Sequence, residues 1–157
     1  MLTQIILAWF YGHILEYFLH KYVLHNRKIR LTFRHHFRNH HKISRRNGFF
    51  DNRYKSFFSK NSFFEVGTLA LLAVLHLPLA AFYPAAYFTL VWSVLMYYVI
   101  HRKMHLDPSW AKKWTPWHFE HHMGKYQNDW WGVRLPIVDL GVKVFGKLWN
   151  KLFRRYN

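Results

Sequence analysis

Residues 61–100 form a forty-residue segment whose single formal charge is Glu65, and this segment limits the possible folds more than any other feature of the chain. A helix needs about 20 apolar residues, with a range of about 17–25, to cross the hydrocarbon core of a bilayer. The segment therefore has room for two short spans, residues 63–77 and 85–100, joined by a proline-flanked turn at 79–83. A chain of 157 residues is too short to surround such a hairpin with soluble structure. We predict a membrane-inserted helical hairpin.

The first nineteen residues are also apolar, but polar groups interrupt them. Gly12, His13 and Glu16 lie within this segment, which has neither a basic start nor a small-residue cleavage site. It therefore differs from a secretory signal peptide, and we predict that residues 1–19 form a retained membrane helix. Ionisable groups within a span usually face the interior of a helix bundle and mark a functional site.

Basic residues are confined to the two remaining segments. All 23 Lys and Arg lie in residues 21–60 or 101–157, against seven Asp and Glu in the whole chain. Basic loops remain in the cytoplasm, so we expect both segments on the cytoplasmic side of a bacterial inner membrane or of the endoplasmic reticulum. The predicted fold is an all-α integral membrane protein, a single domain over residues 1–157. It has three to four membrane helices and a cytoplasmic helical cap.

Residues 137–153 have helical periodicity, with one basic and one apolar side. Lys143, Lys147 and Lys151 recur every four residues on the basic side. The apolar side combines six residues: Val138, Gly141, Phe145, Leu148, Trp149 and Leu152. A cationic amphipathic helix of this kind lies in the headgroup plane of a membrane or packs on the rest of its domain, and the two are compatible.

Histidine is the most informative residue type, with thirteen in the chain. Residues three or four apart share one face of a helix, so a helix with this spacing can present two or three imidazoles to one metal. Ten histidines fall into four such clusters: His20 and His25; His36, His40 and His41; His101 and His105; His118, His121 and His122. His20 and His25 are five apart, about 140° around an α-helix, so this pair needs a bend or approaches the metal from two sides.

Ten imidazoles are too many for one ion, and we predict two ions with about five nitrogens each. Imidazole suits iron, zinc, copper and nickel, whereas calcium and magnesium prefer oxygen. Zinc hydrolases use three protein ligands, so the excess of nitrogen favours two redox-capable ions, with iron first and zinc as a replacement in recombinant material. The chain has no cysteine, which excludes a disulfide scaffold, a zinc ribbon and a thiol enzyme.

Acidic and further histidine residues near the clusters are candidates to support the ligands. Glu16 lies four residues before His20 and is expected to orient its ring, or else to pair with a nearby basic side chain. His13 lies on the same stripe, and Asp129 lies close to the last cluster. His76 is expected to be a span residue far from the site.

The four clusters, in this order around an apolar hairpin, resemble the histidine boxes of the integral-membrane fatty-acid hydroxylase and sterol desaturase superfamily. The resemblance covers about residues 16–146, from the acid before the first box to a closing segment at 128–146. Two departures are present. His36 and His40 are separated by three residues where the commoner form has two, so His35 is an alternative to His36, and the chain has three apolar segments where four are common.

The resemblance implies a membrane-bound non-haem di-iron oxygenase that uses O2 and two external electrons to hydroxylate a C–H bond of a lipid. A desaturase, or a hydroxylase of carotenoids or sterols, is the alternative within the superfamily. An alkyl chain would enter from the bilayer past aromatic walls, for which the candidates are Trp117, Phe119, Trp130 and Trp131. The chain has no flavin or haem motif, so a separate ferredoxin or b-type cytochrome with its reductase would supply electrons to the basic face.

Two functions of other classes are also compatible with parts of the sequence. A basic, aromatic-rich chain fits nucleic-acid binding, but the uncharged block 61–100 and the histidine spacing argue against it, and we expect no nucleic-acid partner. A membrane metal transporter or metal-storage protein would also use histidines. Transport would place ligands near the midplane of the spans, whereas these clusters lie beyond the span ends.

Overall fold

The computed structural model describes the backbone of residues 1–125 and 127–153, and the side chains in these ranges except those of 60, 61 and 149–153. In this part of the chain every regular element is helical. The elements are α1 (Leu2–Leu19), η1 (His20–Leu24), α2 (Arg30–Phe33), η2 (Arg34–His41), α3 (Lys42–Arg46), η3 (Asn52–Lys55), α4 (Lys60–Leu75), α5 (Leu79–Phe82), α6 (Pro84–Leu106), α7 (Pro108–Trp114), α8 (Pro116–Met123) and α9 (Ile137–Phe153).

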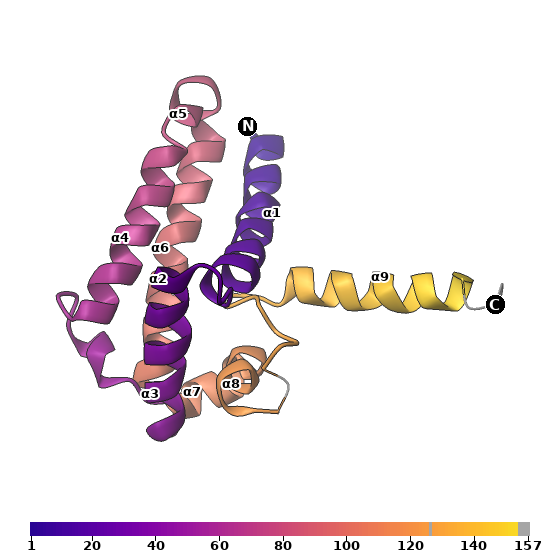
Figure 1. The fold of residues 1–157 in the computed structure, drawn as a ribbon. Helices are drawn as coiled ribbons and strands as arrows, with labels where there is room; N and C mark the ends of the chain where they lie inside the picture. The colour runs from indigo at the N-terminus through magenta and orange to yellow at the C-terminus, as the bar shows by residue number, and fades with distance from the viewer. Residues whose placement is uncertain (126, 154–157) are drawn as a thin grey trace.

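Three long helices, α1, α4 and α6, form a bundle with the N-terminus and α5 at one end (Figure 1). The α4–α6 pair is the predicted helical hairpin, and α5 forms its turn between Pro78 and Pro84. Proline lacks an N–H and fixes φ, so Pro84 is accommodated at the first position of α6. α1 packs closely on α6, and a side chain at Gly12 would lie 3.3 Å from the Ser93 hydroxyl.

Much of the outer surface of the bundle is apolar. Large side chains such as Phe10, Leu71, Phe88 and Trp92 are exposed on its three helices. Soluble monomers rarely expose contiguous apolar surface on this scale. The bundle therefore presents a surface that requires an apolar environment or a partner.

The described residues contain one helix, α6, that is long and apolar enough to cross a membrane, where the sequence led us to expect three or four. The apolar part of α4 is only Ser62–Leu75, about 21 Å of helix, which is shorter than a bilayer core of about 30 Å. α1 has 18 residues but carries His13 and Glu16 on its buried side.

A cap covers the end of the bundle opposite α5, where α7 and α8 follow α6 (Figure 1). Each of these short helices begins with proline, and the Asp107 carboxylate accepts a hydrogen bond from the Trp110 N–H at the start of α7. A small apolar core lies in the cap: Phe49, Met104, Ala111 and Val133. The core shares this space with buried histidines, so the cap is organised around polar rings as much as apolar ones.

The predicted amphipathic helix is present as α9, which leaves the base of α1 and extends sideways from the bundle (Figure 1). Its apolar residues Leu140, Val144, Phe145 and Leu148 are exposed. The predicted positions Trp149, Lys151 and Leu152 have side chains outside the described residues. α9 thus keeps exposed apolar residues, as an interfacial helix would.

Candidate metal centre

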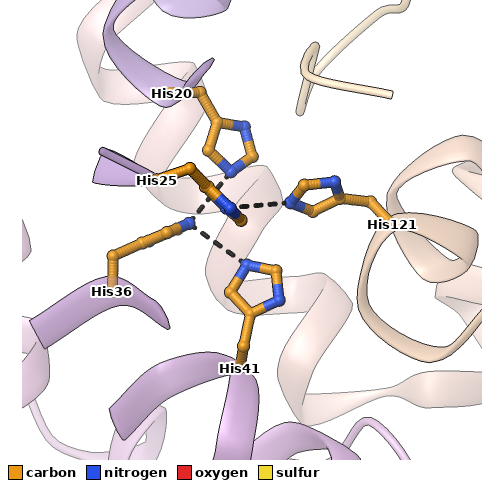
Figure 2. A group of neighbouring side chains, drawn as sticks. All are labelled: His20, His25, His36, His41 and His121. Atoms are coloured by element: carbon orange, nitrogen blue, oxygen red, sulfur yellow. Dashed lines mark hydrogen bonds between the residues drawn. The ribbon is translucent and has the colours of Figure 1, made fainter. Parts of the chain in front are cut away.

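Buried histidines in the cap form two groups whose ring nitrogens converge. The first histidine group contains His20, His25, His36, His41 and His121, and the second contains His40, His101, His105 and His122. Within each group, one nitrogen from every ring lies within 4.8 Å of the others. Figure 2 shows the five rings of the first group pointing to a common centre from three separate segments of the chain.

Two π-helical turns explain how histidines five residues apart can share a face. η1 and η2 are π-helices, and the His25 N–H donates to the His20 carbonyl at 3.2 Å. A π-helical turn bonds residue i to i+5, so both His20 with His25 and His36 with His41 project together. Single π-turns occur frequently at functional sites. The spacing that seemed to require a bend is therefore satisfied by a wider helical turn.

The nitrogen distances in the first group fit a bound transition-metal ion. His36 Nε2 lies 2.9 Å from His20 Nε2 and 3.2 Å from His41 Nε2, and His121 Nε2 lies 3.3 Å from His25 Nε2. Two nitrogens bonded to one ion at about 2.0–2.1 Å lie about 2.9 Å apart at a right angle and about 3.4 Å apart at the tetrahedral angle. An N–H of His36 can donate to only one of its two neighbours, so a shared cation satisfies this arrangement better than hydrogen bonds do.

The outward nitrogens of several rings are held by oxygen acceptors, as is usual for metal-binding histidines. His20 Nδ1 donates to the Trp131 carbonyl at 2.6 Å in the first group. In the second group His101 Nδ1 donates to Glu65 at 2.7 Å, and His105 Nδ1 donates to the Phe49 carbonyl at 2.9 Å. These bonds fix the tautomer, so each Nε2 keeps its lone pair for the centre of its group.

One further carboxylate lies beside the second group, and a strained turn supports it. The Asp51 carboxylate lies 3.5 Å from His40 Nδ1 and also pairs with Arg53. Phe49 has φ of +80°, a left-handed conformation that is rare for an aromatic residue, and it follows Gly48 at φ +61°. This turn places the Phe49 ring in the cap core and its carbonyl on His105. The strained backbone therefore coincides with a ligand-orienting contact.

His118 is the tenth histidine of the predicted set and lies between the two groups. Its side chain is fully buried, and both ring nitrogens lack a hydrogen-bond partner. Its ring centroid is 4.7 Å from that of His122 and 5.1 Å from that of His101, against 5.9 Å from that of His121. His118 is thus placed to complete the second group, although it is not one of the four rings whose nitrogens all lie within 4.8 Å of one another.

Burial favours the neutral form, which binds metals, in several imidazoles of the site. Burial, the largest cause in each case, holds the pKa of six histidines well below the ordinary value: His20, His36, His41, His118, His121 and His122. His25 is partly exposed, and burial with the nearby His40 and Arg45 lowers its pKa to about 3. Since a metal competes with protons for these nitrogens, the site is ready to bind an ion at neutral pH.

His36, not His35, belongs to the first group, while His35 stacks on the Phe64 ring at 4.2 Å between centroids. The π-helical turn explains the difference, because it aligns His36 with His41. His13 is buried against the Trp9 ring on α1, at 4.6 Å between centroids, and does not belong to either group.

Glu16 pairs with an arginine, which is one of the two alternatives that the sequence left open, and it does not contact the His20 ring. Its carboxylate accepts hydrogen bonds from the backbone N–H groups of Val133 and Arg134 and from Arg134 Nε at 2.7 Å. Glu16 thereby anchors the segment that follows the last histidine cluster, whose Trp131 carbonyl holds His20. Asp129 is exposed, and the nearby acid that is buried is Asp139, which accepts from the N–H groups of Trp131 and Gly132.

Glu65, Asp51 and the two carbonyl acceptors were missed in the sequence. Glu65 had a usable signal, because it is the one formal charge in residues 61–100, and a lone acid in an apolar segment usually has a specific partner. Asp51 and the carbonyls of Phe49 and Trp131 had none, since their roles depend on contacts between distant segments.

An apolar cavity of about 170 Å³ leads away from the histidines between α1, α4 and α6. At its inner end it is lined by His20, His36, His40 and His101, and at its far end by His76 and Tyr87. Leucine and valine side chains such as Leu69, Leu90 and Val94 form its walls. Residues 87 and 101 are fourteen positions apart on α6, so the cavity runs about 21 Å along the helices.

The four aromatic residues predicted as substrate walls do not line this cavity. Trp131 is buried in T-shaped contact with His25 and His121 of the first histidine group, and Trp117 Nε1 donates to the Val133 carbonyl at 3.1 Å. Phe119 packs on the cap core, and Trp130 lies under Lys143. The segment carrying Trp130 and Trp131 folds over the cap because Glu16 anchors it, while the cavity opens among the bundle helices.

No protein-family model, curated protein or solved structure matches this chain. Its class is therefore defined by its own geometry: an all-helical protein with two adjacent, buried groups of histidines that could hold metal ions, next to an apolar cavity.

Proposed function

We propose that this chain is a member of the fatty-acid hydroxylase and sterol desaturase superfamily, a membrane-bound di-iron oxygenase that hydroxylates a C–H bond of a lipid. The observation that carries the proposal is that both histidine groups open onto one apolar cavity. His20 and His36 of the first group line this cavity, and so do His40 and His101 of the second. A bound lipid carbon would therefore lie beside the nitrogens that hold the ions.

Two iron ions fit the donor set better than calcium, magnesium or a single zinc. The first group offers five imidazoles and the second offers four with His118 adjacent, all without a thiolate or carboxylate in the groups. Nitrogen-rich sites of this kind suit iron, and zinc could replace it in recombinant material. When bound, the iron pair supplies reductive activation of O2 and insertion of one oxygen atom into an unactivated C–H bond.

The residues of the chain orient the histidine rings, position the substrate and keep water out of the cavity. Glu65 and the carbonyls of Phe49 and Trp131 hold the rings with Nε2 inward. The apolar walls of the cavity keep water away from the reacting carbon, and hydrolytic or proton-transfer roles for the histidines are not needed.

A linear alkyl chain is the substrate shape that best fits the cavity. Pockets for drug-sized ligands enclose about 300–1,000 Å³, whereas this cavity encloses about 170 Å³. A length of about 21 Å exceeds half of a bilayer core of about 30 Å, which is the reach of one acyl chain. These dimensions favour a fatty acyl group over a fused-ring sterol. They leave hydroxylation and desaturation as alternatives, because the two reactions differ only in fine positioning.

A membrane placement accounts for the apolar exterior. In the proposed arrangement α6 crosses the bilayer with α1 and α4 beside it, and the basic segments 21–60 and 101–157 lie in the cytoplasm. α9 leaves the bundle beside the base of α1, where the cap begins (Figure 1), and lies in the headgroup plane with its apolar residues facing the lipid. The site is then at the cytoplasmic end of the spans.

The test combines lipid analysis with metal analysis. We expect a host that expresses the chain with a ferredoxin or b-type cytochrome and its reductase to accumulate a hydroxylated or newly unsaturated lipid. Purified protein should contain close to two ions per chain. His121→Ala, which removes a ring of the first group, should abolish the product while membrane insertion persists. Two ions per chain with metal flux across vesicles and no lipid product would instead identify a metal transporter.

A further inference from the structure

A groove on the outer surface of the cap contains four exposed arginines. It is lined by Arg27, Arg30, Leu31, Phe33, Arg34, Phe37 and Arg38, which we call the arginine groove. Among the described residues the ion-paired acids are Glu16, Asp51, Glu65 and Asp107, and their partners lie elsewhere. The positive charge of the groove is therefore not neutralised by the described part of the chain.

Three of the four arginines lie on the continuous helix of α2 and η2, which also supplies three histidines of the candidate metal site. Arg30, Arg34 and Arg38 recur every four residues along α2 and η2 and are exposed. His36, His40 and His41 lie on the same helix and are buried. One helix therefore separates the arginine groove from both histidine groups.

Aromatic rings connect the floor of the groove to the first histidine group. Phe33 and Phe37 are stacked with their centroids 5.0 Å apart and their planes 13° apart. The Phe37 ring is 5.3 Å from the ring of His25 and 5.5 Å from that of His41. The groove is thus joined to the candidate metal ligands by direct ring contact.

We propose that the arginine groove is the docking site of an acidic one-electron carrier protein, which delivers electrons past Phe37 to the first histidine group. This inference rests on the proposed function. Hydroxylation of R–H by O2 takes up two electrons and two protons and yields R–OH and H2O, so the carrier is oxidised twice per turnover. Complementary charge steers such encounters and raises their rate.

A protein covers this groove better than a membrane surface does. The helix formed by α2, η2 and α3 begins near the level at which α9 leaves the bundle and runs from there toward the α7–α8 end (Figure 1). With α9 in the headgroup plane, the start of α2 at Arg30 lies nearest to the lipid, whereas η2, which carries Arg34 and Arg38, extends into the cytoplasm. A carrier with an acidic surface can contact all four.

The decisive measurement is binding of an oxidised carrier, which requires no lipid oxidation. The double variant Arg30→Glu/Arg34→Glu is compared with Lys112→Glu/Lys113→Glu, which makes the same charge change at two exposed residues of α7. The probes are a plant-type [2Fe–2S] ferredoxin and a soluble b-type cytochrome domain, titrated against the detergent-purified full chain. We expect the groove variant to weaken binding of at least one carrier by more than about tenfold and the α7 variant by less than about twofold.

Three outcomes separate the alternatives. Equal weakening by both variants would overturn the groove as a docking site and leave only a general charge effect. Unchanged carrier binding, with lost binding of the groove variant to vesicles containing phosphatidylserine, would assign the groove to anionic lipid and overturn the proposal. Specific weakening without any lipid product in the host would keep the docking site and refute the proposed oxygenase, so the two failures are distinguishable.

A second variant guards against unfolding as the cause. Arg34→Gln removes one charge without reversing it, and it should weaken the same carrier by a smaller factor while the helical circular dichroism stays unchanged. A large loss of binding with intact helicity in Lys112→Glu/Lys113→Glu would also contradict the groove assignment.

Discussion

The two histidine groups are adjacent but are held in different ways. The first group depends on π-helical turns, in which residues five apart face the same centre. The second takes His101 and His105 from one ordinary helical turn of α6 and is surrounded by the carboxylates of Glu65 and Asp51. The first has one partly exposed member, His25, whereas all four of the second are buried. The first group is therefore the more accessible centre and the second the more rigidly oriented one.

This difference suggests a division of roles within one site. The first group contacts the aromatic floor of the arginine groove through His25 and His41, and so faces the proposed source of electrons. The second has an ionised environment that compensates the charge of a bound cation, because Glu65 and Asp51 lie behind its imidazoles. Both reach the apolar cavity, the first through His20 and His36 and the second through His40 and His101.

The largest effect is expected from removing the anchor of the first group. Glu16→Ala leaves Arg134 buried without its counter-charge and without the carboxylate that holds the N–H groups of Val133 and Arg134. Breaking a buried ion pair costs about 3–5 kcal/mol. We expect a marked drop in the thermal unfolding temperature in detergent. Because Trp131, which orients His20, belongs to the anchored segment, the first group should lose its metal before the second.

The matched control for that variant is Lys103→Met, which breaks the exposed pair between Lys103 and Asp107. Exposed pairs contribute about 0–1 kcal/mol, so this change should leave the unfolding temperature nearly unchanged. Similar losses in the two variants, or loss of metal first from the second group, would contradict the assigned role of Glu16.

A smaller and more selective effect is expected in the second group. Glu65→Gln keeps the shape of the side chain but removes the charge that accepts from His101 Nδ1. Loss of such an outer partner typically weakens metal affinity by about 10–100-fold. Competition with a chelator should release one of the two ions more readily and leave the other unaffected. The control is Glu120→Gln, which changes an exposed acid on α8. Equal release of the metal ion from both variants would show that Glu65 does not support the second group.

The convergence of the histidines was predictable because helix spacing is a local property. The predicted His20, His25, His36, His40, His41, His101, His105, His121 and His122 all belong to the two groups, and helix geometry alone aligned most of them. Contacts made across the fold were not predictable in the same way. Glu16 shares a helix face with His20, but its strongest partner, Arg134, is 118 residues away in sequence. Trp117, Phe119, Trp130 and Trp131 lie outside the apolar cavity for the same reason, since aromatic content near a site in sequence does not show which side of it faces a cavity.

The membrane spans were harder to predict from the sequence than the histidine positions. The hairpin α4–α6 was predicted from composition, yet only α6 has the length and apolarity of a full span in the described chain. Average hydropathy treats a buried polar residue and an exposed one alike, so α1, with Glu16 and His13 on its buried side, scores as less apolar than the surface it presents. Whether a helix can lie in a membrane depends on which of its faces is exposed, and only the packed structure defines that face.

The smallest effect concerns the cavity that both groups share. Ala73 lines the cavity on α4 between the histidines and its far end, so Ala73→Phe should shorten the space for an alkyl chain and leave metal content unchanged. We expect the product distribution to shift toward shorter acyl chains in lipid analysis of the expression host. Leu71→Phe, two residues away on the exposed side of the same helix, adds a similar ring outside the cavity and should leave the distribution unchanged. A shift of equal size in both variants, or none in Ala73→Phe while activity persists, would show that the substrate chain does not occupy this cavity.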